Sequence, residues 1–163
     1  MSKTQENLMA AFAGESQANR KYLAYAKQAD KDGLPQVAKL FRAVAEAETI
    51  HAHTHLRNAG KIGSTLDNLQ DAKAGEVYEF GKMYPEMLKD AEAEGEKNSA
   101  RYFGFAGAVE EVHSKLYQKA IDAKGKLDNV DYYLCETCGY THEGPIDKCP
   151  ICGASANAFY KVG

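Results

Sequence analysis

The sequence has no hydrophobic run long enough to cross a bilayer, and its N-terminal stretch MSKTQENLMAAF shows no signal-peptide pattern. It also lacks an excess of either charge, because 20 Lys and Arg stand against 23 Asp and Glu, for a net charge of -3. Such a balance gives no reason to expect nucleic acid or a membrane surface as a partner. We therefore expect a cytoplasmic protein with no nucleic-acid and no membrane partner.

Cysteine is absent from the chain before Cys135, and no G-x-G-x-x-G dinucleotide loop occurs anywhere. If a nicotinamide-linked reductase supplies this protein with electrons, that reductase would therefore have to be a separate protein. All four cysteines fall within the last part of the chain, as two C-x2-C pairs with an intervening segment: Cys135, Cys138, Cys149 and Cys152. In a reducing compartment this clustering favours a metal site over disulfides.

Up to about residue 124 the chain is rich in good helix formers, with apolar positions every three or four residues. Short segments rich in Gly, Pro and Asn interrupt this pattern. The sequence therefore predicts four helices, at 4–30, 35–58, 68–94 and 97–123. Pro85 lies inside the third, where we expect a kink.

The two helical halves repeat each other. In the first half Glu15 is followed by Glu48, which begins the motif Glu-x-x-His, and in the second half Glu76 is followed by the same motif at Glu110. The offset between the halves grows by one position from the first pair of glutamates to the second, so we expect an insertion in the second inter-helix turn. An unrelated chain of four helices would have no reason to repeat.

Helical spacing places these acidic residues in line with apolar ones. A lone Glu-x-x-His motif usually marks a solvated helix face or a capping pair, but two motifs in register with a repeated glutamate favour a buried site. Glu79 has Ala18 as its counterpart in the first half, so we interpret it as an added ligand. Clustered carboxylates raise one another's pKa, and bound cations would relieve this. The expected site, of iron or manganese, comprises Glu15, Glu48, His51, Glu76, Glu79, Glu110 and His113.

From about residue 125 the composition changes to Gly, Pro and Cys in a stretch too short for a hydrophobic core. We expect two domains, residues 1–127 and 128–163, the second held together by a tetrahedral thiolate site. Alone, such a ribbon would favour zinc. A single iron is the alternative.

Taken in order, these motifs resemble the rubrerythrin family. The resemblance implies a mainly α protein, with a ferritin-like four-helix bundle and a small C-terminal rubredoxin-like β/metal-knuckle domain. It implies that Glu48 and Glu110 bridge two irons and that Glu15 and Glu76 are terminal ligands. His113 would hold one iron throughout, and the other would exchange His51 for Glu79 with oxidation state. Tyr22 and Tyr84 match tyrosines that hydrogen-bond near the site.

The resemblance further implies a cytoplasmic peroxidase that reduces hydrogen peroxide in oxidative stress defence. Its cofactors would be a di-iron site and one Fe(Cys)4 site. Its electrons would come from a separate NAD(P)H-linked reductase or a rubredoxin-type donor, and it would be a homodimer, head-to-tail or helix-swapped. A ferroxidase, iron-storage or iron-binding protein is the alternative, and a pure electron carrier is a third candidate.

Overall fold

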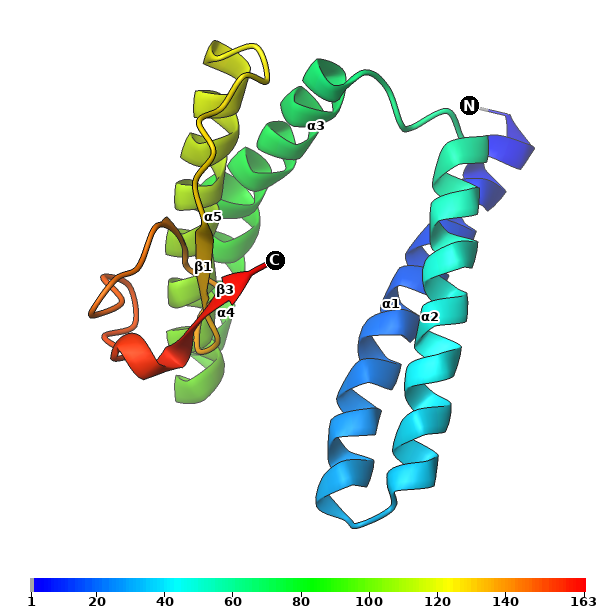
Figure 1. The fold of residues 1–163 in the computed structure, drawn as a ribbon, viewed down its shortest axis with the longest axis horizontal. Coiled ribbons are helices and arrows are strands. Elements are labelled where there is room, and N and C mark those ends of the chain that lie inside the picture. The colour runs from blue at the N-terminus through cyan, green and yellow to red at the C-terminus, as the bar shows by residue number, and fades with distance from the viewer. Residues whose placement is uncertain (1) are drawn as a thin grey trace. The chain divides into compact units, whose positions relative to one another are not determined.

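The computed structural model describes residues 2–163, which fold into two compact units that meet in sequence between Gly63 and Ser64. Each unit is built on a pair of antiparallel helices, and the second also carries a small sheet (Figure 1). No helix in the described part of the chain is long and apolar enough to span a membrane.

The first unit is a hairpin of α1 (Lys3–Lys31) and α2 (Pro35–Asn58). The Ser2 side chain caps α1 by accepting a hydrogen bond from the Gln5 backbone N–H. The two helices approach closely because the residues buried between them are alanines: Ala26, Ala29, Ala38, Ala45 and Ala52. Asn19 of α1 adds hydrogen bonds to the Ala45 carbonyl at 2.8 Å and the Thr49 hydroxyl at 2.9 Å.

The second unit begins with an interrupted helix that packs against α5 (Lys97–Asp122). The interrupted helix consists of α3 (Thr65–Tyr78), a π-helical segment η1 (Glu79–Met83) and α4 (Tyr84–Glu94). Ser64 and Asp67 form a capping box at the start of α3. Gly95 ends α4 in a left-handed conformation, with φ of 77°, which glycine adopts without strain.

The observed helices of the second unit correct three predictions. The third helix begins at Thr65 rather than residue 68, and it is not a regular helix kinked by Pro85 but changes to π geometry before that proline. The insertion in the second half does not lie in the turn, since the turn at 95–96 is shorter than the turn at 32–34. A π turn accommodates one inserted residue within a continuous helix. The insertion therefore belongs to η1.

A small antiparallel sheet forms the C-terminal module. Its strands are β1 (Tyr132–Cys135), β2 (Thr141–Glu143) and β3 (Phe159–Val162), in the order β2-β1-β3, with a short helix η2 (Ala156–Ala158) before β3. The register pairs Tyr133 with His142 on one side and Leu134 with Tyr160 on the other. The buried core of this module contains three of the cysteines, and the partly buried Tyr140, Ile151 and Phe159 pack against them.

The module packs on α5 of the same unit. Val109 of α5 is buried in one cluster with Cys135, Cys138 and Cys149. The Lys119 ammonium, also on α5, lies 2.5 Å from the Glu143 carboxylate of β2. The predicted fold class, mainly helical with a small C-terminal strand module, is confirmed. The expected boundary at 127/128 falls inside the second unit and stays a prediction.

Candidate metal centres

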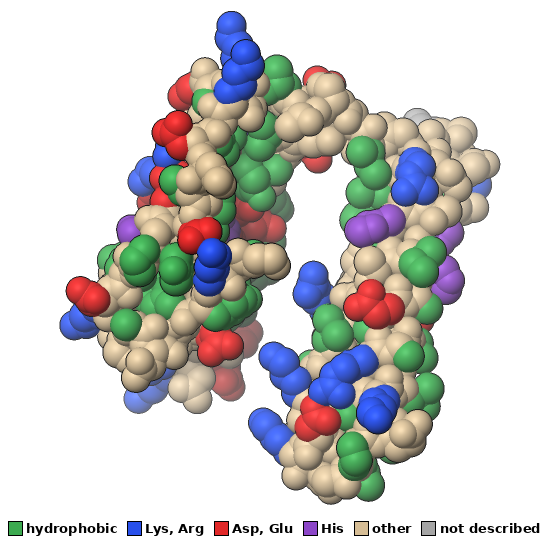
Figure 2. Space-filling model, viewed as in Figure 1, with side chains coloured by type: hydrophobic (Ala, Val, Ile, Leu, Met, Phe, Trp, Pro, Cys, Tyr) green, Lys and Arg blue, Asp and Glu red, His purple; other side chains and the backbone are tan. Residues whose placement is uncertain are grey.

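The first unit brings together three of the predicted ligands. Glu15 of α1 and Glu48 and His51 of α2 place ligand atoms within 4.8 Å of one another. His51 Nδ1 lies 2.8 Å from Glu48 Oε2 and 3.9 Å from Glu15 Oε1. The histidine side chain is 55% exposed. In Figure 2 the histidines of this unit lie toward one end of the hairpin, while Lys and Arg side chains gather toward the α1–α2 turn.

The second unit repeats this arrangement in a more buried setting. Glu76 of α3 and Glu110 and His113 of α5 again place ligand atoms within 4.8 Å of one another. His113 Nδ1 lies 2.7 Å from Glu110 Oε2 and 3.6 Å from Glu76 Oε2. The matching distances in the two units mean that the sequence repeat is also a repeat of ligand geometry.

Glu76 shows that this cluster is incomplete without a cation. Its Oε2 atom is buried and has no hydrogen-bond partner in the described structure. Burial, then the contact with Glu110 and the repulsion between the two carboxylates, raise the pKa of Glu76 to about 7. Among the described residues, no lysine or arginine forms an ion pair with any of the six clustered side chains. An ion bound between these oxygens would satisfy the orphaned atom and favour the ionised carboxylates.

Glu79 and Tyr84 lie at the two ends of the π segment. Burial and the nearby Glu110 raise the pKa of Glu79, although Glu79 is not one of the three clustered residues. Burial and the negative charge of Glu110 also raise the pKa of Tyr84, which therefore keeps its hydroxyl proton at neutral pH. π segments often occur at functional sites. Here one begins at the residue that breaks the repeat.

Two other tyrosines have different surroundings. Tyr22 packs its ring against Phe41 and Tyr25, with centroids 6.2 Å from each, and its predicted hydrogen bond near the site stays a prediction. Tyr117 of α5 lies near Glu76 and Glu110. Burial and these two charges raise the pKa of Tyr117. Its position one turn after His113 was the available signal.

The four cysteines form a third cluster, with all ligand atoms within 4.8 Å. The sulfur atoms of Cys135 and Cys152 are 3.7 Å apart, and those of Cys138 and Cys149 are 3.6 Å apart. Disulfide sulfurs lie about 2.05 Å apart. A tetrahedral ion with metal–sulfur bonds of about 2.3 Å needs sulfur–sulfur edges of about 3.8 Å. The spacing fits one metal ion.

Backbone groups already favour thiolate at one of these positions. Burial acts to raise the pKa of Cys135, but the backbone N–H groups of Cys138 and Thr137 outweigh it, so the pKa is lowered. Burial raises the pKa of Cys138 and Cys152. A buried thiol with a raised pKa ionises when a cation binds it, since the ion stabilises the thiolate.

Comparison with known families agrees with these three clusters. The family model described as Rubrerythrin matches residues 6–121. The chain belongs to the rubrerythrin family. A second model, described as the rubredoxin-like domain of rubrerythrin, matches residues 133–160 and so contains all four cysteines.

Curated relatives in the family match over nearly the whole chain. Rubrerythrin-2 of Clostridium acetobutylicum is 36% identical, and the match covers 96% of this chain and 95% of the relative. Nigerythrin of Nitratidesulfovibrio vulgaris is 35% identical over 96% of this chain and 85% of the relative. A solved structure of partially reduced nigerythrin matches with a TM-score of 0.60 at 34% identity, covering 99% of this chain and 88% of the other.

Membership of the rubrerythrin family indicates iron as the cofactor, and the observed donors fit it. Carboxylate oxygens with one imidazole in each cluster suit iron, and four thiolates in a tetrahedron suit a single iron. The chain is therefore a di-iron, rubredoxin-like protein in oxidative stress defence, and its relatives indicate an oxidoreductase.

Proposed function

We propose that this protein is a non-haem di-iron peroxide reductase, which reduces hydrogen peroxide to water with electrons relayed through an Fe(Cys)4 site. The main support is the buried, unpartnered carboxylate oxygen of Glu76, which faces His113. The same histidine contacts the cysteine module on its other side. A carboxylate site suited to two-electron chemistry thus adjoins a site suited to one-electron transfer.

The proposed role of each side chain is the one that the resemblance to the rubrerythrin family implies. Glu48 and Glu110 would bridge the two irons, and Glu15 and Glu76 would each bind one. His113 would hold its iron throughout, while His51 and Glu79 would alternate on the other. Two ferrous ions balance four carboxylates, and oxidation adds positive charge, which the carboxylate of Glu79 meets better than a neutral imidazole.

When bound, the iron pair supplies the two electrons that, with two protons, convert one hydrogen peroxide to two water molecules. The protein contributes the surroundings of that reaction. Tyr84 keeps its proton and can donate a hydrogen bond toward the carboxylates. Cys135, Cys138, Cys149 and Cys152 would hold the iron that returns electrons one at a time.

The remaining parts of the proposal concern partners and location. Electrons would reach the cysteine site from a separate NAD(P)H-linked reductase or a rubredoxin-type donor. The cytoplasm is the proposed location, because four unbridged cysteines suit a reducing compartment. We also propose that the protein is a homodimer, in which helical hairpins pair so that the clusters carrying His51 and His113 complete one another.

Ferroxidase or iron-storage activity is the competing function. A storage protein has no use for a one-electron module, and here that module packs directly on the helix carrying Glu110. To distinguish the two, the protein is reduced anaerobically and mixed in a stopped-flow instrument with hydrogen peroxide or with oxygen. We expect reoxidation by peroxide to be at least about tenfold faster than reoxidation by oxygen, and we expect no mineral iron to accumulate. Faster reaction with oxygen, with iron accumulating, would favour the ferroxidase.

Two variants sharpen this test. Glu79→Gln should slow reoxidation by peroxide about tenfold or more, because the amide cannot meet the charge added on oxidation. Glu111→Gln is the matched control, since Glu111 lies on α5 but is exposed and pairs with Lys115. Equal rates for the two variants would remove Glu79 from the proposed mechanism.

The homodimer is tested by light scattering and then by complementation. Chains carrying Glu48→Gln and chains carrying Glu110→Gln are refolded together with iron. If hairpins are exchanged between subunits, half of the sites in a mixed dimer carry neither substitution and recover peroxide reduction. If bundles close within one chain, mixing recovers nothing. A monomer in solution would contradict the proposal.

A further inference from the structure

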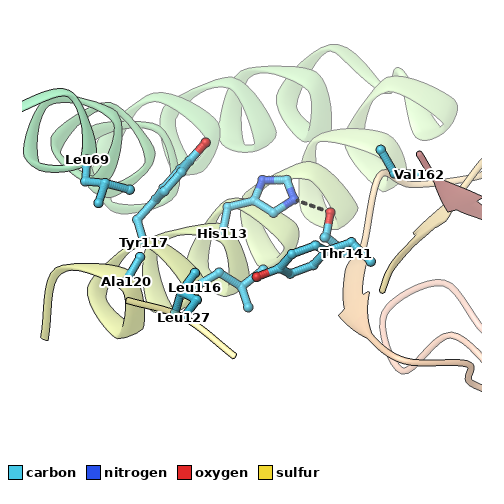
Figure 3. A pocket seen from close by; sticks show the side chains of 9 residues that line it. Leu69, His113, Leu116, Tyr117, Ala120, Leu127, Thr141 and Val162 are labelled. Carbon is cyan, nitrogen blue, oxygen red and sulfur yellow. Dashed lines mark hydrogen bonds between the residues drawn. The ribbon is translucent and has the colours of Figure 1, made fainter. Parts of the chain in front are cut away.

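His113 has a defined neighbour on each side of its ring. Nδ1 faces Glu110 Oε2 at 2.7 Å, as described above. Nε2 faces the C-terminal module, where it lies 3.2 Å from the Thr141 hydroxyl and 3.3 Å from the Gly139 carbonyl oxygen (Figure 3). The ring therefore stands between the carboxylate cluster and the turn that follows Cys138.

The chemistry of the neighbours decides which nitrogen carries a proton. A backbone carbonyl can only accept, so Nε2 must donate to Gly139. The Thr141 hydroxyl donates to the same carbonyl at 3.3 Å, which leaves its lone pairs free to accept from Nε2. Both acceptors thus require Nε2–H, and the neutral ring then presents the lone pair of Nδ1 to a cation among the carboxylates.

These acceptors are fixed by the same turn that carries two of the thiols. The Gly139 N–H donates to the Cys135 carbonyl at 2.8 Å, and the Cys135 N–H donates to the Tyr140 carbonyl at 2.9 Å. Gly139 has a φ of +86°, which a residue with a side chain rarely adopts. A metal ion held by Cys135 and Cys138 would therefore also hold the groups that orient His113.

The equivalent histidine of the first unit has no such support. His51 makes the same Nδ1 contact with Glu48, but its side chain is 55% exposed. Within the described residues, no hydrogen-bond acceptor is recorded for its Nε2. The two histidines have equivalent places in the repeat and differ in the hydrogen-bond partners of their Nε2 atoms.

We propose that Thr141, together with the Gly139 carbonyl, is a positioning element that fixes the His113 ring for metal binding. The cysteine module thereby holds a histidine of the carboxylate site in place. A metal ion bound to the four thiolates therefore strengthens metal binding at the carboxylates. This inference rests on the proposed ligand role of His113 and explains why that histidine, rather than His51, would stay bound throughout a cycle.

The test uses zinc alone, so that it is independent of peroxide chemistry and iron redox state. Zinc first fills the thiolates, and a chelating dye then reports its affinity for the carboxylate cluster. Nitrogen-15 NMR of histidine-labelled, zinc-loaded protein reports the exchange rate of the His113 Nε2 proton. We expect a slowly exchanging proton in the unaltered protein. We also expect Thr141→Val, which has nearly the same shape, to weaken zinc about five- to tenfold and speed this exchange.

Three matched variants separate positioning from mere packing. Thr141→Ser restores the hydroxyl and should recover both readouts to within about twofold. Thr65→Val makes the same change on an exposed side chain of α3, away from the thiols and from His113, and should alter neither. Lys119→Met removes the ion pair with Glu143 that also docks the module, without touching His113.

The outcomes are decisive. The proposal is overturned if the unaltered protein shows no protected Nε2 proton, or if Thr141→Val binds zinc as the unaltered protein does. It is also overturned if Lys119→Met weakens zinc as much as Thr141→Val, because docking alone would then explain the effect. If the valine variant fails to fold, Thr141→Ser and the unaltered protein still test the proposal. Peroxide reduction is not measured, so its absence would bear on the proposed function alone.

Discussion

At the scale of single residues, Glu76 has a buried carboxylate oxygen without a hydrogen-bond partner in the described structure. Its folded pKa of about 7 lies above the ordinary value of 4.5, so the folded state holds a proton that the unfolded state releases. The stability of metal-free protein should therefore fall as pH rises from about 4.5 to about 7 and level off above that. Metal binding reverses this preference, because a cation stabilises the ionised carboxylate.

Glu76→Gln tests this argument. The substitution keeps a polar group of similar shape but removes the charge, so metal-free Glu76→Gln should lack the Glu76 part of the pH dependence. Near pH 7.5 we expect it to be more stable than the unaltered protein by about 1 to 2 kcal/mol, after allowance for solvent screening. Urea unfolding at about pH 5 and about pH 7.5 measures the difference. A variant with an unchanged slope would mean that Glu76 is already neutralised by the protein.

The sequence predicted individual ligands better than it predicted their supports. Spacing alone predicted that Glu110 and His113 lie together, because residues three apart share a helix face. It could not identify Thr141, which contacts His113 only because the module folds back onto α5. Such a contact depends on tertiary packing between segments 28 residues apart, and the sequence around Thr141 does not indicate it.

At the scale of secondary-structure elements, the π segment η1 is the main departure from regular geometry. It inserts one residue into the helix, and the Tyr84 N–H bonds to the Glu79 carbonyl five residues back. Tyr84 then packs so closely on α5 that a Cβ on Gly107 would lie 3.2 Å from the Tyr84 Cβ. The segment thus sets the rotation of α4 relative to α3 and of Tyr84 relative to Glu76.

Deleting Gly81 should convert η1 to an α-helix. Each residue turns the helix by about 100°, so α4 would rotate relative to α3 and lose its contact with Gly107. We expect unchanged helical circular dichroism, a stability loss of about 2 kcal/mol and at least about tenfold weaker metal binding at Glu76, Glu110 and His113. Gly81→Ala keeps the length and faces open space, so it is the control. A deletion variant that binds metal normally would show that the π segment is not needed.

Periodicity predicted the existence of the helices but not this segment. Helix formers and apolar residues continue through 79–83, so the composition is the same for α and π geometry. The shift of the repeat offset by one position is the signal of an inserted residue, but it does not distinguish a turn from a π turn within a helix. Only the observed turn lengths placed the extra residue inside the helix.

At the scale of the whole molecule, the helical parts and the C-terminal module depend on different forces. The helices bury mainly alanines, whereas the module has three short strands around its thiols. Removing metal should therefore unfold the module and leave the helices folded. After chelation we expect loss of amide NMR signals from β1, β2 and β3, with less than about a fifth of the helical circular dichroism lost. A module that keeps its dispersed signals without metal would contradict this.

The sequence predicted this overall organisation because composition changes sharply near residue 125 and because the halves repeat. It did not predict that the chain divides into compact units between Gly63 and Ser64, with three of the six clustered side chains in each. That division depends on which helices share more contacts, and each helix has a similar apolar pattern.

The central claim is that metal ions, rather than protons or lysines, neutralise the buried carboxylates. The most direct measurement is anaerobic titration of metal-free protein with isotopically enriched ferrous iron, followed by Mössbauer spectroscopy. We predict one iron per chain with tetrahedral sulfur parameters and two with oxygen and nitrogen parameters, the latter lost in Glu110→Gln but not in Glu111→Gln. A folded protein that binds iron only at the cysteines would contradict the account.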